Sequence, residues 1–270
     1  MAITTLNGLI AGATVPVEVF KAGGAAGEAA GIWHSMAYTS GLPGAAAVPA
    51  PGLAGEALTS YAGQLPFVNP SAGQSTYLTR WALAASQTGM ARLYDRLWHN
   101  SGLVLTTTTA QTINSVTWPA RDRAGTTAGA GVGVGIEMST ATGNAGAVAT
   151  ITMSYTNSAG VAARTATITS FPVTAVAGTF VPFQLQAGDV GVRSIQSVTL
   201  GTSLVSGAVH LVAYRSILNL SMPNANIGVE LNAVTGGLPQ LYDNSVPFLH
   251  WLLSGTTVPT LNGTVSYAQG

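Results

Sequence analysis

The stretch AVATITMSYTNSAGVAARTATITSF, residues 147–171, decides the fold class of this chain. Its first half places Ile151, Met153 and Tyr155 on one face and threonine or serine on the other, and residues 164–168 repeat this alternation. A period of two residues is typical of a β-strand with one buried face. The NSAG sequence between the two halves supplies turn residues. The stretch therefore predicts an antiparallel β-hairpin.

Three further stretches outside this hairpin predict strands. Residues 194–215 favour a second hairpin that turns near SG, and residues 180–192 favour a single strand. Residues 76–102 form either a helix interrupted by threonine and glycine or a hairpin that turns at SQTG, and the hairpin is the preferred interpretation. Strands at this spacing, with no convincing helix between them, predict a mainly β fold: an antiparallel β-sandwich or jelly-roll-like body over residues 76–270.

Residues 1–75 differ from the rest because they are rich in Ala, Gly and Pro. A short Ala-rich helix is predicted from Ala25 to Tyr38, stopped by the glycine and proline that follow. The sequence PGAAAVPAPG, residues 43–52, predicts an extended segment, because each proline lacks an amide donor and restricts the residue before it. We therefore expect an N-terminal arm, residues 1–75, that packs on the body or on a neighbouring subunit.

Charged residues are unusually rare in this chain. They make up 7% of it, nine basic and nine acidic, while 47% of the residues are hydrophobic. Typical soluble proteins contain about 25% charged residues. Because interface cores are depleted in charge, the composition predicts a subunit that works inside an assembly. The arginines are scattered, and Asp122 partly cancels the nearest cluster, Arg121 and Arg123, so nucleic-acid binding is not expected.

The residue inventory restricts the chemistry further. The chain contains no cysteine, which excludes disulfides, thiolate zinc sites and a cysteine nucleophile. Residues 1–20 lack the features of a signal peptide, and no uninterrupted run of about 20 apolar residues predicts a membrane span. The four histidines, at 34, 99, 210 and 250, do not show metal-ligand spacing. We therefore expect no cofactor and no metal.

The glycine-rich segment GAGVGVG, residues 129–135, shares only its glycine content with a nucleotide-binding loop. Its glycines recur at every second residue rather than in G-x-G-x-x-G, and a strand-like segment follows where a helix should begin. Glycines that alternate along a strand more often mark a close backbone approach or a subunit contact.

The sequence YDRLWHNSG, residues 94–102, contains the main candidates for catalysis. Asp95 and His99 would be the orienter and the base of an enzyme, but four residues along a strand separate them by roughly 13 Å, too far for a hydrogen bond. The preferred interpretation is that Asp95 pairs with a nearby arginine and that the tryptophans fill core or interface pockets. The candidate interface residues are Trp33, His34, Trp98, Trp118 and Trp251.

Several segments of the second half carry a resemblance to a known group of proteins. They are WPARDRAGTTAGAGVGVGIE, SYTNSAGVAARTATI, FVPFQLQAGDVGVRSIQSVTL, GAVHLVAYRSIL and the earlier LYDRLWHNSGL. This region resembles structural proteins from the head and tail-assembly modules of tailed bacteriophages, and is similar to proteins that coat or cement the capsid. The resemblance implies a β-sandwich or jelly-roll body joined to its neighbours by arms, arranged as a closed ring such as a trimer. It supplies no catalytic residues.

These observations together predict a virion structural protein, a decoration or cement protein on the capsid surface. Its expected partners are the major capsid protein and copies of itself in a homotrimer, with no nucleic acid and no membrane. One alternative is a tail or receptor-binding component that stacks glycans on exposed Trp98 and Trp118. A second alternative is an enzyme that uses Asp95 and His99.

Overall fold

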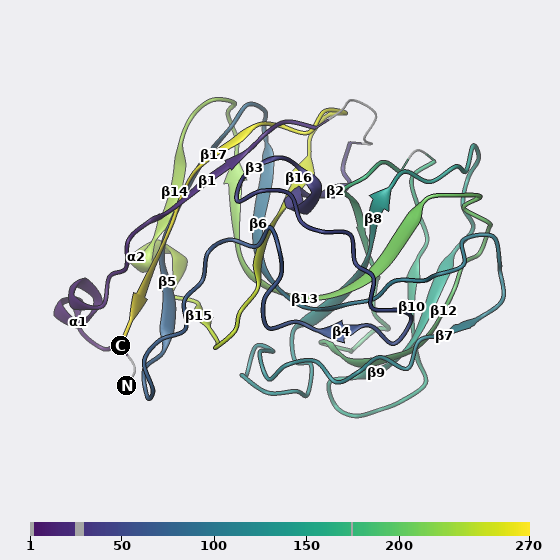
Figure 1. The fold of residues 1–270 in the computed structure, drawn as a ribbon, viewed down its shortest axis with the longest axis horizontal. Coiled ribbons are helices and arrows are strands. Elements are labelled where there is room, and N and C mark those ends of the chain that lie inside the picture. Colours follow the sequence, from purple (N-terminus) through teal and green to yellow (C-terminus); the bar gives the residue numbers. More distant parts are fainter. Residues whose placement is uncertain (1–2, 25–29, 174) are drawn as a thin grey trace.

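The computed structural model describes residues 3–24, 30–173 and 175–270, and its strands pair in antiparallel fashion. Strand makes up 42% and helix 5% of the structure, which confirms the prediction of a mainly β chain. Figure 1 shows three layers: a central barrel, one sheet on its left and a smaller sheet on its right. The finer prediction of a sandwich or jelly roll is not confirmed, because the central layer closes on itself.

Six strands form the closed ring of the barrel. Each pairs with two neighbours, and the ring closes because the long strand β13 pairs with both β8 and β6. A seventh short strand adds to β6 on the outside. In ring order the strands are β13 (Ala208–Met222), β8 (Val132–Thr140), β11 (Thr179–Pro182), β2 (Trp33–Ser35), β16 (Pro247–Leu253) and β6 (Gly89–His99), with β4 (Glu56–Ala57) on β6.

The sheet on the left of Figure 1 contains the first and last strands of the chain, and we call it the terminal sheet. It packs on β6, β13 and β16 of the barrel through an apolar core that includes Trp81, Leu93 and Trp251. Its strands, in order, are β14 (Val229–Asn232), β5 (Thr76–Ala85), β17 (Leu261–Gln269), β1 (Val17–Lys21) and β3 (Gly41–Leu42), with β15 (Gln240–Leu241) also on β5.

The smaller sheet on the right contains the predicted hairpin of residues 147–171, and we call it the hairpin sheet. Its strands, in order, are β10 (Arg164–Ile168), β9 (Ile151–Asn157), β12 (Val192–Thr199) and β7 (Gln111–Thr112). β9 and β10 pair from Tyr155 opposite Arg164 to Ile151 opposite Ile168, so the hairpin is confirmed. The predicted apolar face, with Met153 at its centre, is buried against the barrel.

Two other predicted hairpins are wrong as pairings, although their strands exist. A short connection at residues 86–88 joins β5 to β6, yet β5 belongs to the terminal sheet and β6 to the barrel. β12 and β13 divide in the same way between the hairpin sheet and the barrel. In both cases the two strands face each other across a core instead of sharing hydrogen bonds. Alternation along the sequence is the same for either arrangement, so it could not distinguish them.

The long strands β6 and β13 contribute side chains to the cores of all three layers. Leu93 of β6 packs towards the terminal sheet and Leu97 towards the hairpin sheet, while Tyr94 points into the barrel. The register between β6 and β13 shifts near Ala213 and near Ser216. Both faces of β6 are buried because one lies against the barrel interior and the other is covered by the two outer sheets.

The alternating glycines of residues 129–135 mark a close approach inside this chain. A Cβ at Gly135 would lie 2.2 Å from the Phe180 ring, and one at Gly133 would lie 2.9 Å from the Tyr214 ring. Barrels of eight strands are just wide enough for their side chains, so a six-stranded ring leaves less room. Glycine on β8 provides the space that the aromatic rings opposite occupy.

The N-terminal region differs from its prediction in two ways. Residues 25–29 of the predicted helix lie outside the described residues, and its second half forms β2 and a 3₁₀ turn at Met36–Tyr38 instead. Moreover, β1 to β4 are members of the terminal sheet and the barrel, so the separate arm is not confirmed. Residues 43–52 form neither helix nor strand, and their extended conformation stays a prediction. The helices are α1 (Leu6–Ala11) and α2 (Ala233–Gly236), and the boundary at residue 75 stays a prediction.

Candidate functional site

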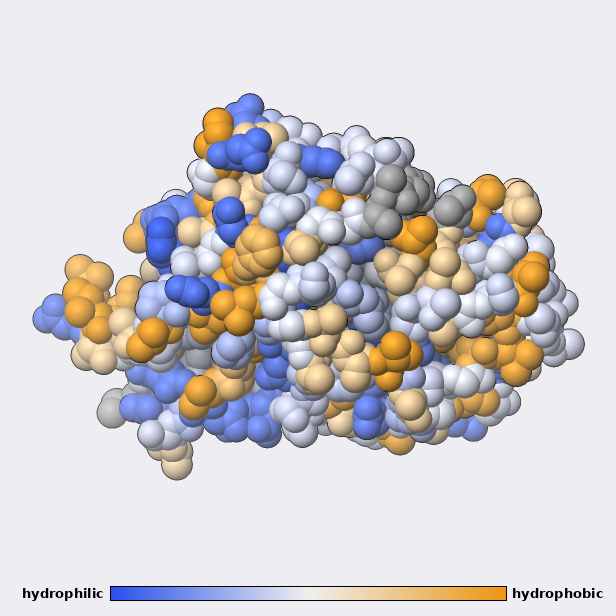
Figure 2. Space-filling model, turned by 45° about the horizontal axis from the view of Figure 1, so that its top comes forward, coloured by the Kyte–Doolittle hydropathy of each residue, from blue (hydrophilic) through white to orange (hydrophobic). Residues whose placement is uncertain are grey.

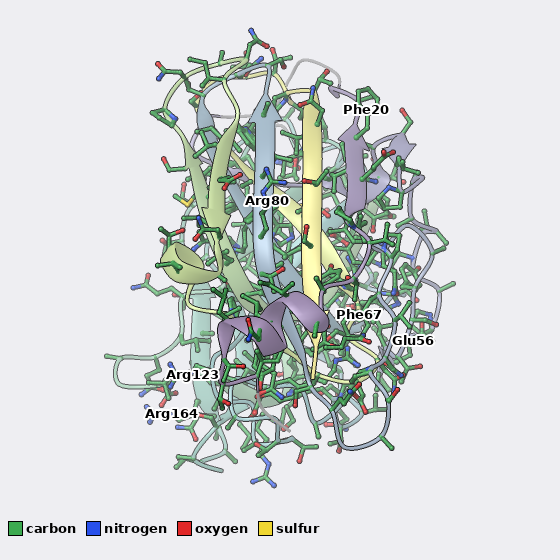
Figure 3. The ribbon with its side chains drawn as sticks, turned by 90° about the vertical axis from the view of Figure 1, so that its left-hand side faces the viewer. Phe20, Glu56, Phe67, Arg80, Arg123 and Arg164 are labelled. Atoms are coloured by element: carbon green, nitrogen blue, oxygen red, sulfur yellow. The ribbon has the colours of Figure 1, made fainter. Side chains whose placement is uncertain are left out.

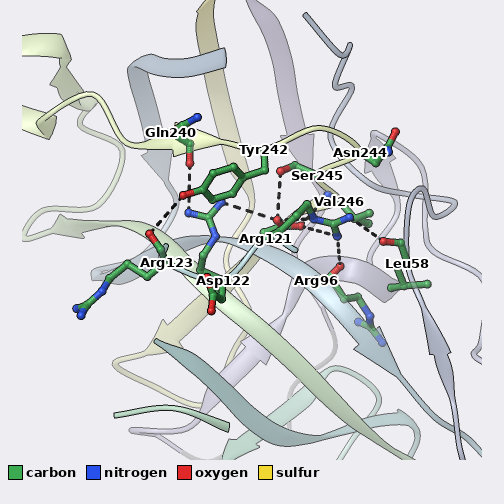
Figure 4. A network of polar contacts seen from close by, with 12 residues as sticks. Leu58, Arg96, Arg121, Asp122, Arg123, Gln240, Tyr242, Asn244, Ser245 and Val246 are labelled. Carbon is green, nitrogen blue, oxygen red and sulfur yellow. Dashed lines mark hydrogen bonds and ion pairs between the residues drawn. The ribbon is translucent and has the colours of Figure 1, made fainter. Parts of the chain in front are cut away.

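Asp95 lies on β6 and is fully buried. Arg121 donates to both oxygens of Asp95, with Nε 2.9 Å from Oδ2 and Nη2 3.1 Å from Oδ1. The hydroxyl of Ser245 and the amide of Val246 also donate to this carboxylate, at 3.1 and 2.8 Å (Figure 4). Asp95 therefore pairs with an arginine, as the preferred interpretation predicted, and ties β6 to two loops that are distant in sequence.

Two buried arginines share this single carboxylate. Besides Asp95, Arg121 donates to the carbonyls of Leu58 and Arg96, at 2.8 and 3.2 Å. Arg215 of β13 approaches Asp95 only to 3.8 Å and lies 5.2 Å from the centre of the Tyr242 ring. Burial lowers the pKa of Arg215 in spite of the nearby Asp95. The cluster is therefore held by one negative charge between two positive charges, which makes Asp95 essential to it.

Asp122, next to Arg121, organises the loop that follows it. Its carboxylate accepts from the amides of Ala124, Thr126, Gly129 and Ala130 and from the Thr126 hydroxyl, all within 2.8–3.0 Å. Burial alone would raise the pKa of Asp122, but these hydrogen bonds outweigh it and hold the pKa below its ordinary value. The carboxylate is thus a structural acceptor that shapes the entry into β8.

A second ion pair lies between β6 and β8 of the barrel. Arg96 contacts both oxygens of Glu137, at 2.7 and 3.0 Å, and both side chains are at most 1% exposed. The Tyr38 hydroxyl donates to the same carboxylate at 2.9 Å. Burial alone would raise the pKa of Glu137, but the charge and hydrogen bonds of Arg96 hold it below its ordinary value.

His99 takes part in this second network and not in that of Asp95. The Nε–H of Arg96 donates to Nδ1 of His99 at 3.1 Å, which leaves the ring proton on Nε2, 2.9 Å from Glu56 Oε1. Burial, with Arg96 and His210 nearby, lowers the pKa of His99 to about 2. A general base needs a pKa near the working pH. The structure therefore does not bring Asp95 and His99 together as a catalytic pair.

His250 of β16 occupies the middle of the barrel. Its ring stacks on Tyr94 at 3.9 Å and lies 4.1 Å from the Phe180 ring, measured between centroids. Both ring nitrogens are buried and make no hydrogen bond to the described residues. Burial, with Arg92 and Arg96 nearby, holds the pKa of His250 well below 6.5. The imidazole acts here as a neutral aromatic ring.

The candidate interface residues do not lie together on a surface. Trp98 and Trp118 are at most 1% exposed, with rings 5.6 Å apart in the core below the hairpin sheet, and Trp251 is buried in the core below the terminal sheet. These three are core residues of this chain, which corrects their assignment to an interface and the stacking role of Trp98 and Trp118. His34 is also buried. Trp33 is half-buried, and the guanidinium carbon of Arg92 lies 3.8 Å from the centre of the Trp33 ring.

Two hollows on the surface are relevant to binding. The first, which we call the Tyr242 pocket, has a volume of about 430 Å³ and lies between residues 119–121 and 240–244. Its lining includes the side chains of Gln74, Gln240 and Asn244, so it is polar. The second, which we call the Val15 groove, has a volume of about 300 Å³, and its lining is mostly apolar.

The end of the molecule that carries the Val15 groove also exposes several aliphatic side chains. Among the described residues, five of the six most exposed large hydrophobic side chains belong to α1, α2 and the groove. They are Leu6, Ile10, Val15, Val68 and Val234, exposed by 69, 66, 85, 75 and 92%. In Figure 2 the projection at the left edge is largely orange, and Figure 3 shows α1 and α2 on the side of the terminal sheet.

The sequence indicated some of these features and missed others. The pairing of Asp95 with an arginine was predictable, but which of the arginines it would be was not, because Arg121 lies 26 positions away. The roles of Glu137 and Tyr242 had no local signal in the sequence. Leu6 and Ile10 sit in an ordinary apolar run, so only the structure shows that they remain exposed.

No family model, no curated protein and no solved structure matches the chain. Within residues 3–24, 30–173 and 175–270, no helix is long and apolar enough to cross a membrane. No group of three or more histidine, aspartate or glutamate side chains in that part of the chain is placed to hold a metal ion.

Proposed function

We propose that this chain is a structural protein of a tailed-bacteriophage virion, a capsid decoration or cement protein. It binds the major capsid protein and copies of itself, as a homotrimer on the capsid surface. It stabilises the head by burying charge-poor surface and has no catalytic activity.

The observation that carries this proposal is the distribution of charge. Of the eighteen charged side chains, seven are buried inside this chain, which leaves eleven for the remainder. Sixteen large hydrophobic side chains are exposed among the described residues. Soluble monomers normally separate such residues with charge, whereas surfaces that are buried in assemblies are depleted in it. The buried charged residues are Lys21, Asp95, Arg96, Arg121, Asp122, Glu137 and Arg215.

A cement protein of this kind works through contact area. Burial of apolar surface contributes about 25 cal/mol per Å², and a standard interface buries about 1,600 Å² in total, so the gross term reaches tens of kcal/mol. Loss of translational and side-chain freedom offsets much of this gain in each contact. Many copies bound at the joints of a shell would still oppose its expansion.

The internal chemistry also supports a structural role. Asp95 and Glu137 have their oxygens occupied by arginines, hydroxyls or amides of the same chain. His99 stays uncharged at any ordinary pH because its pKa is about 2. These groups hold the fold together and are not free to transfer a proton to a substrate.

The proposal is tested on particles. Virions from cultures that produce this chain are purified, and the chain is located by immunogold electron microscopy and counted by quantitative mass spectrometry. We expect label on the head at a fixed ratio to the major capsid protein. Heads stripped of the chain should burst at a lower temperature and recover when the purified chain is added back. Absence of the chain from purified particles would contradict the proposal.

A tail or receptor-binding role is the second candidate, and the Tyr242 pocket favours it. Gln74, Gln240 and Asn244 offer amide groups that can bind sugar hydroxyls, beside an aromatic ring. Immunogold label on tails, together with glycan binding that Gln74→Ala and Asn244→Ala weaken, would select this role over cementing.

A further inference from the structure

Helix α1 packs only at its margin on its own chain, next to β17. It spans only six residues, Leu6–Ala11, none of which is fully buried. Leu9 is half-buried, whereas Leu6 and Ile10 are 69 and 66% exposed. The Thr5 hydroxyl caps its first turn by accepting from the Gly8 amide. Isolated helices shorter than about 12 residues are marginal in water, so a helix of this length needs tertiary contact to persist.

The Val15 groove lies beside the root of this helix. Its walls include Val15, Val17, Pro66, Val68 and Tyr267, from the segment after α1, the 66–68 segment and the last strand. Val15 and Val68 are 85 and 75% exposed, so aliphatic surface here is in contact with water. A groove with these walls binds aliphatic side chains.

The backbone between α1 and the groove is pinned to β17. The amide of Gln269 donates to the Gly12 carbonyl at 2.8 Å, and the amide of Thr14 donates to the Tyr267 carbonyl at 2.9 Å. Gly12 is so close to β17 that a Cβ there would lie 2.2 Å from the Gln269 carbonyl oxygen. The pinned segment directs α1 away from the body, as Figure 1 shows, and leaves the groove of the same chain open.

The absence of charge on both surfaces indicates the kind of partner they bind. Residues 3–17 contain no charged residue, and neither does the lining of the groove. A charged partner would lose hydration here without gaining an opposite charge, whereas aliphatic side chains have no charge to desolvate. The chain itself supplies such a helix.

We propose that α1 of one copy docks Leu6 and Ile10 into the Val15 groove of a second copy of this chain. This inference rests on the proposed function, because it names the contact by which copies of the subunit join. Since helix and groove are different surfaces of one chain, the contact is head-to-tail and can close a ring.

The test uses one variant for each half of the contact. The helix variant carries Leu6→Asn and Ile10→Asn, and the groove variant carries Val68→Asp. The matched control, Val190→Asp, changes a valine that is 67% exposed outside this surface. Mass is measured by light scattering after size-exclusion chromatography, over a hundredfold range of concentration, and a chain that begins at Gly12 serves as a second helix variant.

We expect the helix and groove variants each to raise the dissociation constant of self-association about a hundredfold. The helix variant loses two aliphatic contacts, and the groove variant places an unpaired carboxylate in an apolar contact. The control should match the unchanged chain. A mixture of the helix and groove variants should form a one-to-one heterodimer, because it contains one intact helix and one intact groove. A wild-type chain that stays monomeric throughout would overturn the proposal.

The outcomes also separate this contact from the proposed function. If the chain is multimeric and every variant assembles like wild type, the docking of α1 is wrong while assembly through another surface stands. If the variants fail to self-associate as expected but the chain is absent from virions, the contact stands and the proposed function fails.

Discussion

The buried interior of the molecule and its α1 end use side chains in opposite ways. The interior holds arginines, carboxylates, histidines and tyrosines, most of them joined by ion pairs or ring contacts within 3–6 Å. The α1 end presents aliphatic side chains to solvent and contains no charge over residues 3–17. The buried charged groups are therefore paired within the chain, whereas the aliphatic side chains of the α1 end are not covered by it.

This difference shows which groups find their partners within the chain and which need another molecule. A buried ion pair adds little net stability over an apolar core, but it fixes the partners of each strand, since removal of one member leaves a charge unpaired. An exposed aliphatic patch does not stabilise the single chain. It contributes favourable free energy only when a partner buries it. The barrel is complete in one chain, and the α1 end is not.

The largest expected effect comes from the interior. Asp95→Ala leaves Arg121 and Arg215 buried without their carboxylate, and should lower the free energy of unfolding by about 3–5 kcal/mol. Urea unfolding followed by tryptophan fluorescence measures this loss. The matched control is Glu230→Ala, which removes the exposed partner of Arg80 and should cost less than about 1 kcal/mol. Equal losses in the two variants would contradict the importance of burial.

The narrowness of the barrel gives the next effect. Gly135→Ala places a Cβ against the Phe180 ring and should lower the free energy of unfolding by about 1–3 kcal/mol through overpacking. Phe180→Leu in the same chain should restore part of that loss by making room. Gly146→Ala, where a Cβ meets nothing within 4 Å, is the control and should be nearly neutral. A harmless Gly135→Ala would show that the barrel is wider than described.

Acid should act on the interior through its histidines. Burial lowers the pKa of His99, His210 and His250 in the folded chain, so unfolding takes up protons once the pH falls below 6.5. Stability should therefore fall between pH 7 and pH 5, by up to about 1.4 kcal/mol per pH unit for each histidine. Glu137 and Asp122, whose pKa values are lowered, lose their contribution only in more acidic solution.

His250→Phe isolates one of these histidines. Phenylalanine keeps an aromatic ring against Tyr94 and breaks no hydrogen bond to the described residues, because the imidazole nitrogens make none. Urea midpoints at pH 7 and pH 5 should then differ less for the variant than for the unchanged chain. The same slope in both would mean that His250 does not titrate on unfolding.

The smallest effect on the stability of the single chain is expected at the α1 end. Leu6→Asn with Ile10→Asn should change its free energy of unfolding by no more than about 0.5 kcal/mol, because neither side chain is buried. Unfolding measured at a concentration low enough to keep the chain monomeric checks this value. A loss as large as that of Gly135→Ala would show that α1 packs on its own chain.

Local sequence patterns predicted strands but not the partners of those strands. The alternation of residues 151–168 identified a hairpin because both strands and their turn are consecutive and share one sheet. Residues 76–99 and 194–215 were also predicted as hairpins, yet their strands divide between two layers. A strand buried on one face has the same pattern in a hairpin and in a connection between two sheets, so only long-range pairing distinguishes them.

The candidate site was less predictable than the fold. The low number of charged residues was visible in the sequence. That charged side chains pair in the interior was not, since Glu137 and Arg96 are 41 positions apart. The predicted helix ending at Tyr38 was wrong over Trp33–Ser35, because β11 and β16 pair with those residues and override local helix propensity. Trp98 and Trp118 were expected on an interface because the sequence does not show that two sheets enclose them.

The central claim is that this chain is completed by its partners. The most direct test is the molar mass of the unchanged protein, measured by light scattering across a hundredfold range of concentration in a buffer of physiological ionic strength. We expect one fixed multimer over most of that range, with the α1 end covered. A well-behaved monomer at every concentration would contradict it, since exposed aliphatic surface with almost no charge would then be stable in water without a partner.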